Sequence, residues 1–229
     1  MNSNVKLLTA LNDGKFDELR DMLKENIREE SAKGLGKKKQ LSIINSIMTK
    51  AAKEPRLQAN TYIPFGDKYA FTDGRITIFS DETFGFEMSR SFLDFSSFLP
   101  HSFAFSKTVR FEEAYVKTFL DLNKTVKDME DLIPILIKDT ETGCLLGLDP
   151  RYVANIMQFA PVAAFKYIPE RINGHCIASP VFAVNEAEEV IGMIFPIQIT
   201  DQMLERYMNN PDIELVSDEI TIDDISLEQ

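Results

Sequence analysis

An Asp73-Gly74 pair between two runs of strand-forming residues is the feature that most restricts how this chain can fold. Asp-Gly is among the strongest short signals for a β-hairpin, because glycine readily adopts the positive φ that a tight turn requires. The sequence therefore predicts strands over Lys68–Thr72 and Arg75–Ser80, and another strand before them over Asn60–Phe65. Three strands joined by tight turns form an antiparallel meander.

A helical pattern stands directly before these strands. Apolar residues recur at helical spacing between Lys37 and Ala52, and Pro55 ends the pattern. The opposite face of this helix carries Lys39, Ser42, Ser46, Lys50 and Lys53. No Asp or Glu occurs between Ser31 and Lys53, so this face is either an ordinary solvated surface or a surface that contacts phosphate groups.

The net charge of the whole chain is negative although this segment is basic. The 229 residues include 25 Lys and Arg against 36 Asp and Glu, which gives a net charge of −11. Through Asn60 there are 12 basic and 8 acidic residues, a balance of +4, so the rest of the chain carries −15. An acidic protein can present a local positive surface, and the overall charge therefore does not exclude contact with nucleic acid.

The rest of the chain repeats the order of a helix followed by strands. Asp149-Pro150 is an N-cap followed by proline at the first helical position, and it opens a helix that extends to Phe159. The other predicted helices are Val5–Leu11, Phe16–Glu30, Phe111–Lys127 and Asp201–Met208, and the other predicted strands are Thr83–Met88, Leu132–Lys138, Cys144–Leu148, Val162–Ile168, His175–Val184 and Glu189–Ile199. This order indicates an α+β protein with a duplicated helix-and-strand unit.

We find no enzyme signature in the sequence. His101 and His175 stand in no metal-ligand spacing, and the common phosphate-binding, nucleophile-elbow and zinc-protease motifs are absent. A pairing of Cys144 or Cys176 with either histidine stays open, because such a pair forms in space rather than in sequence. We therefore expect no catalytic residues, no cofactor and no metal.

Acidic residues gather around the predicted hairpins, at Asp67, Asp73, Asp81 and Glu82. Asp67 and Asp73 suit either a magnesium site or the hydrogen bonding of tight turns, and we favour the turns. Ten of the 17 phenylalanines lie between Phe79 and Phe119, and they suit either core packing or a stacking platform for bases. A platform needs basic neighbours, which are few there, so we favour packing.

The cysteines and the apolar segments bear on location. Two cysteines make no disulfide framework, so we expect a reducing, cytoplasmic environment. The longest apolar stretch, Val190–Ile199, is about half a membrane span, and Met1–Ala10 lacks the features of a signal peptide. We therefore expect no association with a membrane.

Four short motifs follow one another in the C-terminal half. They are Pro150, Tyr152-Val153, Ser179-Pro180-Val181 and Phe195-Pro196-Ile197-Gln198-Ile199. In this order they resemble the last domain of bacterial DNA polymerase sliding clamps, although Gln198 stands where the family has arginine. The segment Leu41–Ser80 is similar to the start of a clamp domain, with a basic helix and then strands around Phe71-Thr72-Asp73-Gly74-Arg75. Together these segments cover about half of the chain.

The resemblance implies a DNA-clamp-like α+β fold, in which antiparallel sheets back paired helices that line a ring around DNA. It divides the chain into a helical N-terminal segment (1–35), a first clamp-like half (36–130), a second clamp-like half (131–199) and an acidic tail (200–229). It also implies DNA contacts by Lys37, Lys38, Lys39, Lys50, Lys53 and Arg151, and a partner-peptide pocket at Phe195, Pro196 and Ile197. Because 229 residues are too few for three clamp domains, a ring would require a homo-oligomer, and a clamp-like protein that closes no ring is equally open.

We therefore expect a non-enzymatic DNA-tracking or replication accessory factor, which binds double-stranded DNA weakly and without sequence preference and engages a replication or other DNA-processing protein. The alternative is an acidic protein-interaction or inhibitor module that mimics DNA or regulates a nucleic-acid enzyme without binding DNA. Another interpretation takes Gln40–Ile44 as a clamp-binding peptide, but Leu41 and Ile44 fall on the face that we expect to be buried. We expect Asp212–Glu228 to be a solvated tail, unless it competes with DNA for the Lys37–Lys53 helix or covers the Phe195–Ile197 strand.

Overall fold

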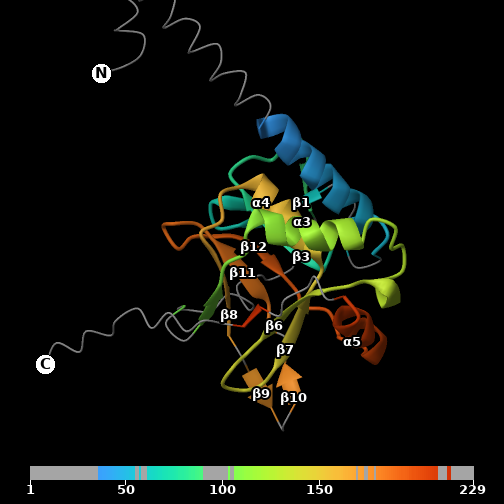
Figure 1. Cartoon of the computed structure of the whole chain (residues 1–229). Coiled ribbons are helices and arrows are strands. Elements are labelled where there is room, and N and C mark those ends of the chain that lie inside the picture. Colours follow the sequence, from blue (N-terminus) through green and yellow to red (C-terminus); the bar gives the residue numbers. More distant parts are fainter. Residues whose placement is uncertain are drawn as a thin grey trace, which may run out of the picture. The chain divides into compact units, whose positions relative to one another are not determined.

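A computed structural model describes residues 36–54, 57, 61–89, 103, 106–168, 170–172, 175–177, 179–210 and 216–217 (Figure 1). The chain divides into two compact units, Met1–Ser42 and Ile43–Gln229. The first unit is described only over 36–42, which are helical and belong to a helix over 36–51. The helices expected over Val5–Leu11 and Phe16–Glu30 lie outside the described residues. The packing reported below is that of the second unit.

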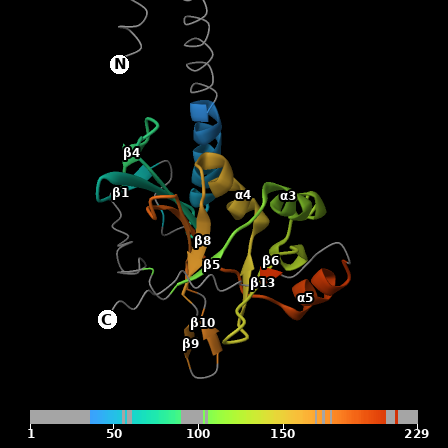
Figure 2. The ribbon, with the colours of Figure 1, turned by 60° about the vertical axis from the view of Figure 1, so that its left-hand side comes forward.

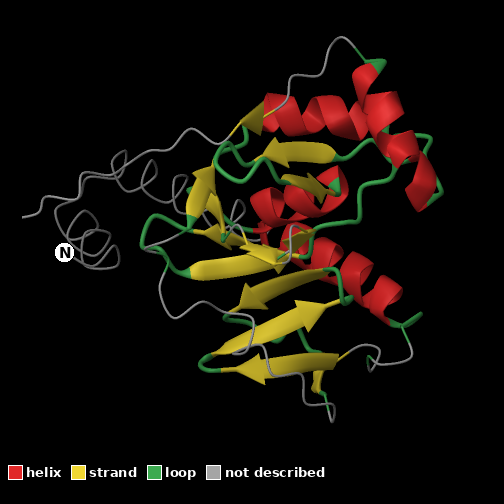
Figure 3. Ribbon diagram, turned by 90° about the horizontal axis from the view of Figure 1, so that it is seen from below, coloured by secondary structure: helices red, strands yellow, loops and turns green. Residues whose placement is uncertain are grey.

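An eight-stranded sheet organises the second unit (Figures 1 and 3). In spatial order its strands are β4 (Glu87–Met88), β1 (Thr61–Phe65), β2 (Lys68–Thr72), β3 (Ile76–Ser80), β12 (Val190–Ile194), β11 (Val181–Val184), β8 (Ala164–Tyr167) and β5 (Lys107–Val109). The pairing of β1 with β4 is parallel, and the other pairings in this sheet are antiparallel.

The six middle strands form two meanders that meet at their third strands. β1, β2 and β3 pair in that order, and so do β8, β11 and β12, with the β9–β10 hairpin (Glu170–Ile172 and His175–Ile177) inserted after β8. β3 then pairs antiparallel with β12, with Ile78 opposite Gly192. Each meander follows a helix, which is helix 36–51 in the first half and α4 (Pro150–Phe159) in the second. The helix-then-meander order therefore occurs twice.

The two halves also share residues at matching places. Ile47-Met48 of helix 36–51 corresponds to Ile156-Met157 of α4, and Ile47 and Ile156 are both fully buried. Tyr62-Ile63-Pro64 in β1 corresponds to Tyr167-Ile168-Pro169, which starts at the last residue of β8. These matches agree with the duplication that the order of elements predicts.

Helices cover one face of the sheet (Figure 3). Ile44 and Ile47 of helix 36–51 and Ile156 of α4 belong to one core cluster with the inward-facing residues of β2, β3 and β12. A Cβ atom at Gly192 of β12 would lie 2.9 Å from Cδ1 of Ile156 and 2.9 Å from the carbonyl oxygen of Thr77. α4 therefore approaches the sheet at a point where only glycine leaves room.

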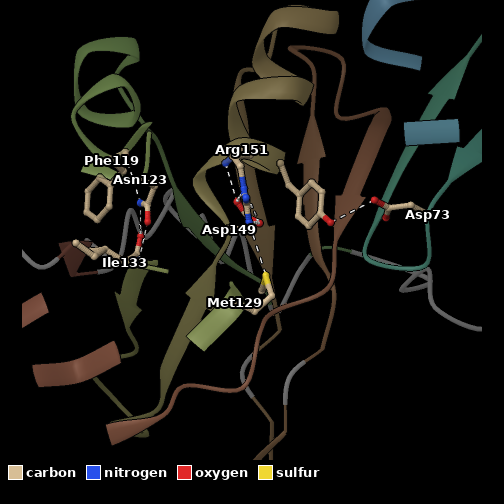
Figure 4. A network of polar contacts seen from close by, with 8 residues as sticks. Asp73, Phe119, Asn123, Met129, Ile133, Asp149 and Arg151 are labelled. Atoms are coloured by element: carbon tan, nitrogen blue, oxygen red, sulfur yellow. Dashed lines mark hydrogen bonds and ion pairs between the residues drawn. The ribbon is translucent and has the colours of Figure 1, made fainter. Parts of the chain in front are cut away.

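A second, three-stranded sheet joins the halves. It has the order β13 (Val216–Ser217), β6 (Ile135–Lys138) and β7 (Leu145–Leu148), and α3 (Glu113–Leu122), the short 3-10 helix η2 (Met129–Asp131) and α5 (Asp201–Met208) complete the unit (Figure 2). α3 packs against α4. The buried side chain of Asn123 ties the end of α3 to the chain before β6, because it donates to the carbonyls of Phe119 and Ile133 and accepts from the Ile133 N–H (Figure 4).

The α+β class is confirmed, and the predicted helix over Asp201–Met208 is present. The expected helix over Phe111–Lys127 is shorter, because α3 ends at Leu122. The expected single strand over His175–Val184 is two strands, β10 and β11, which pair in different sheets. Leu41 is 37% exposed, so its predicted place on the buried face is wrong.

The phenylalanines that the structure describes pack as expected. Phe79, Phe111 and Phe119 are buried, and Phe84 and Phe86 make edge contacts with Phe71. Phe92, Phe95, Phe98 and Phe105 lie outside the described residues. Core packing therefore accounts for this part of the aromatic cluster without a platform for bases.

The cysteines differ from the expectation. Cys144 is disulfide-bonded, and Cys176 is the only other cysteine in the sequence, so one bridge is present where a reducing environment would keep thiols, although one bridge is no framework. The turn between β6 and β7 lies beside the β9–β10 hairpin in both ribbon views, which brings together segments that are distant in the sequence (Figures 1 and 2). The disulfide also removes Cys144 as a thiol partner for a histidine. The cytoplasmic location stays a prediction.

Candidate nucleic-acid interface

Helix 36–51 and α4 contact each other through Lys50 and Tyr152. The Lys50 Nζ lies 4.6 Å from the centroid of the Tyr152 ring, a distance at which an ammonium group is attracted to the face of an aromatic ring. Tyr152 is buried and Lys50 is half-buried. The contact places the basic end of the first helix beside the start of α4.

The outer surfaces of these two helices hold uncharged polar and basic side chains. Asn45, Ser46, Thr49 and Lys53 are exposed in or just after the first helix, and Gln158 is exposed in α4. Residues 43–53 contain no Asp or Glu, and neither does α4. This carboxylate-free surface is the candidate interface, which we call the helix-pair surface.

Arg151, at the start of α4, is bound to the residue that caps the helix (Figure 4). Asp149 accepts hydrogen bonds from the Arg151 backbone N–H at 2.9 Å and from its guanidinium at 2.9 and 2.6 Å. These bonds raise the pKa of Arg151, although burial works against them. Asp149 is 1% exposed, and the ion pair fixes the guanidinium beside the helix start, where its Nη2 lies 3.7 Å from the Met129 sulfur (Figure 4).

Asp73 performs the turn chemistry that the sequence predicts. Its Oδ1 accepts hydrogen bonds from the backbone N–H groups of Arg75 and Ile76, at 2.9 and 3.0 Å. Its Oδ2 accepts a hydrogen bond of 3.2 Å from the Tyr152 hydroxyl (Figure 4). Burial and then the nearby carboxylates of Asp73 and Asp149 raise the pKa of Tyr152 well above its usual value. Tyr152 is therefore a neutral hydrogen-bond donor.

Lys50 lies among several charges. Burial lowers its pKa, and the neighbouring guanidinium groups of Arg151 and Arg75 lower it further, while Asp73 and Asp149 oppose the change. No described carboxylate forms an ion pair with Lys50, since both nearby aspartates are engaged by other donors. The ammonium therefore lies on Tyr152 without a direct counter-ion among the described residues.

The predicted DNA-binding lysines fall into two groups. Lys37, Lys38 and Lys39 are exposed and belong to the first unit. Lys50 and Lys53 belong to the second unit, where Lys53 is exposed and Lys50 turns toward α4 instead of lying fully on the solvated face. Helical periodicity predicts on which side of its own helix Lys50 lies. It does not predict that α4 packs beside this helix and half-buries the Lys50 side chain.

The predicted peptide pocket is brought together in part. An open groove of about 530 Å³ is lined mostly by apolar residues, namely Gly143, Leu145, Leu146, Pro196, Ile197, Gln198, Ile199 and Leu204. Pro196 and Ile197 therefore line the groove, whereas Phe195 packs against a separate cluster with Phe79 and Met193. The Ile197 N–H donates to the Gly147 carbonyl at 2.8 Å, which holds this segment beside β7. Leu204 of α5 also lines the groove, and it is not among the pocket residues that the resemblance implies.

Sequence reasoning named only Arg151 in α4 and missed the uncharged polar side chains of that helix. Asn155 and Gln158 occupy places in α4 that correspond to Ser46 and Thr49 in the first helix, by the same match that pairs Ile156 with Ile47. Arg75 was also missed, because its proximity to Lys50 arises from the fold. The absence of acidic residues in both helices is the sequence signal that could have identified α4.

Within the described residues, no group of three or more His, Cys, Asp or Glu side chains could hold a metal ion. No described helix is both long and apolar enough to cross a membrane. No protein-family model, curated protein or solved structure matches the chain. The resemblance to sliding clamps therefore rests on the motifs of this sequence alone.

Proposed function

We propose that this protein is a non-enzymatic, clamp-like factor that holds double-stranded DNA weakly and without sequence preference. The observation that carries the proposal is that residues 43–53 and α4, which form the helix-pair surface, contain no Asp or Glu, although the chain has a net charge of −11. The other long helices differ, since α3 and α5 both carry acidic side chains. A phosphate backbone is repelled by carboxylates and accepts hydrogen bonds from amides, hydroxyls and lysines.

The duplicated architecture supports the clamp-like part of the proposal. Two adjacent helices on one face of a sheet of two meanders correspond to the arrangement that the resemblance implies for one clamp domain. One such domain cannot encircle DNA, so a closed ring would need several copies of the chain. An open form would use the same helix-pair surface without closure.

The apolar groove supports a partner for this factor. We propose that a replication or other DNA-processing protein places a short apolar peptide in this groove, against Leu145, Leu204 and the segment 196–199. The groove is open and lined mostly by apolar residues, and among the described residues β7 is paired on this side at the bridge between Gly147 and Ile197. An extended peptide would find both apolar contacts and a strand edge there.

Charge reversal with a matched control tests the DNA contact. The double variant Lys50→Glu/Lys53→Glu should weaken binding to a 20–30 base-pair duplex by about tenfold or more at low salt. Lys117→Glu/Lys124→Glu makes the same change of charge at exposed positions in and just after α3, and should weaken binding much less. Equal losses in the two variants would contradict a localised interface. No binding at low salt, combined with capture of a basic nucleic-acid enzyme, would favour the acidic inhibitor instead.

A further inference from the structure

We propose that the disulfide of Cys144 is a redox-sensitive clasp on the groove that Pro196 and Ile197 line. In the oxidised chain this clasp holds the turn between β6 and β7, which forms one wall of the groove. Reduction to two thiols frees the turn and loosens that wall. The clasp rests on the proposed function only for the partner peptide that the groove would hold, and its effect on the chain itself needs no partner.

The place of Cys144 in the groove wall is the first argument for the clasp. Cys144 is 3% exposed, and its two neighbours in the sequence, Gly143 and Leu145, both line the groove. The only other cysteine in the sequence is Cys176, in the β9–β10 hairpin. Because a disulfide keeps the two Cα atoms within a narrow range of distances, the wall at Gly143 and Leu145 is tethered to that hairpin.

The β9–β10 hairpin is the second argument, because it is a small element of its own. Its strands pair with each other in a two-stranded sheet and with no other described strand. A hairpin of two strands is only marginally stable by itself. The β6–β7 turn lies beside it in both ribbon views (Figures 1 and 2). Breaking the disulfide should therefore release the turn and the hairpin locally, without unfolding the eight-stranded sheet.

The other bonds of the β6–β7 turn hold its opposite end. The Thr142 N–H donates to Oδ1 of Asp139 at 2.6 Å, and the Gly143 N–H donates to the Asp139 carbonyl at 2.9 Å, so these bonds stay within the turn. The ion pair of Asp139 with Lys107 ties the turn to β5, at the end where β6 finishes. The clasp ties the end where β7 begins, which is the groove side. Reduction therefore removes the anchor on that side.

The chemistry is thiol–disulfide exchange with a dithiol reductant as the co-reactant. One thiolate of the dithiol attacks a sulfur of the disulfide, forms a mixed disulfide and releases a protein thiolate, which takes up a proton. The second thiol of the reductant then displaces the other protein sulfur and closes the disulfide of the oxidised reductant. Two electrons and two protons thus pass to Cys144 and Cys176.

The clasp also agrees with the location that the sequence predicts. Where disulfides occur in cytosolic proteins, they are usually transient and catalytic or redox-sensing. A disulfide of Cys144 that opens and closes with the supply of dithiol reductant is therefore compatible with a cytoplasmic protein.

Amide hydrogen exchange by NMR in the 15N-labelled full chain tests the clasp without DNA or a partner. One sample stays oxidised and the other is reduced with dithiothreitol in the absence of denaturant; alkylation after the dithiothreitol is removed counts the thiols by mass spectrometry. We expect two thiols per reduced chain. The N–H groups of Gly143 and Ile197, bonded to Asp139 and Gly147, should exchange about tenfold faster after reduction. Amides paired between β2 and β3 should keep their rates.

Three results would overturn the clasp. A chain that keeps its disulfide in dithiothreitol is not redox-sensitive. Unchanged exchange at Gly143 and Ile197 in the reduced chain would show that the disulfide does not shape the groove. Equal acceleration in β2 and β3 would make the disulfide a support of the whole unit instead of a local clasp. Since neither sample contains DNA or a partner, each of these results leaves the proposed function as it stands, and a failure to bind DNA leaves the clasp.

A double variant separates the clasp from side effects of the reductant. Cys144→Ser/Cys176→Ser cannot form the disulfide, so Gly143 and Ile197 should exchange as fast in buffer as in the reduced parent, and dithiothreitol should change nothing further. Circular dichroism checks that the variant folds like the parent, and the reduced parent carries the test by itself if it does not. Exchange in the folded variant that matches the oxidised parent would contradict the clasp.

Discussion

The hydroxyl of Tyr152 donates a hydrogen bond of 3.2 Å to Oδ2 of Asp73, and this bond joins α4 of the second half to the β2–β3 turn of the first. The same ring lies under the Lys50 ammonium. Tyr152, which belongs to one of the motifs that resemble sliding clamps, therefore contacts both the β2–β3 turn, through its hydroxyl, and Lys50 of the first helix, through its ring.

The Tyr152→Phe variant tests the hydroxyl contact. It removes one hydrogen bond and leaves a buried carboxylate oxygen without that donor, which should lower the free energy of unfolding by about 1–2 kcal/mol. Urea unfolding followed by circular dichroism measures the change. Tyr69→Phe is the matched control, because the half-buried Tyr69 hydroxyl has no hydrogen bond to a described residue, and it should change stability by less than about 0.5 kcal/mol. Equal changes would show that the bond to Asp73 contributes nothing.

The ion pair between Lys107 and Asp139 predicts how stability responds to acid. The Lys107 Nζ lies 2.7 Å from Oδ2 of Asp139, whose side chain is fully buried. Burial alone would raise the pKa of Asp139, but hydrogen bonds from Lys107 and Thr142 outweigh it and lower the pKa. A carboxyl whose pKa is lower in the folded state stabilises above its unfolded value of about 3.9, and this stabilisation is lost as the pH falls through the folded pKa.

Asp139→Asn should therefore flatten the loss of stability below about pH 4. At pH 7 it should cost about 3 kcal/mol, because it removes the buried carboxylate 2.7 Å from the largely buried ammonium of Lys107. Urea midpoints measured from pH 2 to pH 7 give both quantities. Asp67→Asn, in an exposed turn, serves as the control. A variant whose acid dependence follows that of the parent chain would refute this role for the ion pair.

Gly192 tests the packing of α4 on the sheet. Gly192→Ala would place a Cβ atom 2.9 Å from a backbone oxygen, which cannot move aside as a flexible side chain does. We expect a loss of about 1–3 kcal/mol in the free energy of unfolding. Gly36→Ala adds the same atom where nothing lies within 4 Å, and thermal unfolding should show no loss of stability for it. An unchanged melting temperature for Gly192→Ala would contradict the close approach of β3 and of Ile156 in α4 to Gly192.

Much of the fold follows from local sequence signals. The Asp73-Gly74 turn, the Asp149-Pro150 helix start and the Asp201–Met208 helix occur where their patterns predict them, because caps and tight turns depend on neighbouring residues. The break after β10 and the short strand β5 were missed, since both depend on strand partners that are distant in the sequence.

The candidate site was only partly predictable for the same reason. The lack of acidic residues around Lys50 and Lys53 is visible in the sequence, but the contact of Lys50 with Tyr152 joins residues of two different helices. The Cys144 disulfide likewise depends on a hairpin that lies far along the chain. Two cysteines are too few for a disulfide framework, as the composition indicates. Composition does not show whether the fold brings the two cysteines together.

The most direct test of the central claim is the map of backbone amide shifts when duplex DNA is added to the 15N-labelled chain at low salt. The account predicts that, within residues 43–210, the shifts concentrate in residues 45–53, at Arg75 and in α4, and that they fade as salt rises, because the contacts are to phosphates. Shifts centred instead on α3 or α5, or no shifts at low salt, would contradict the assignment of the helix-pair surface to DNA.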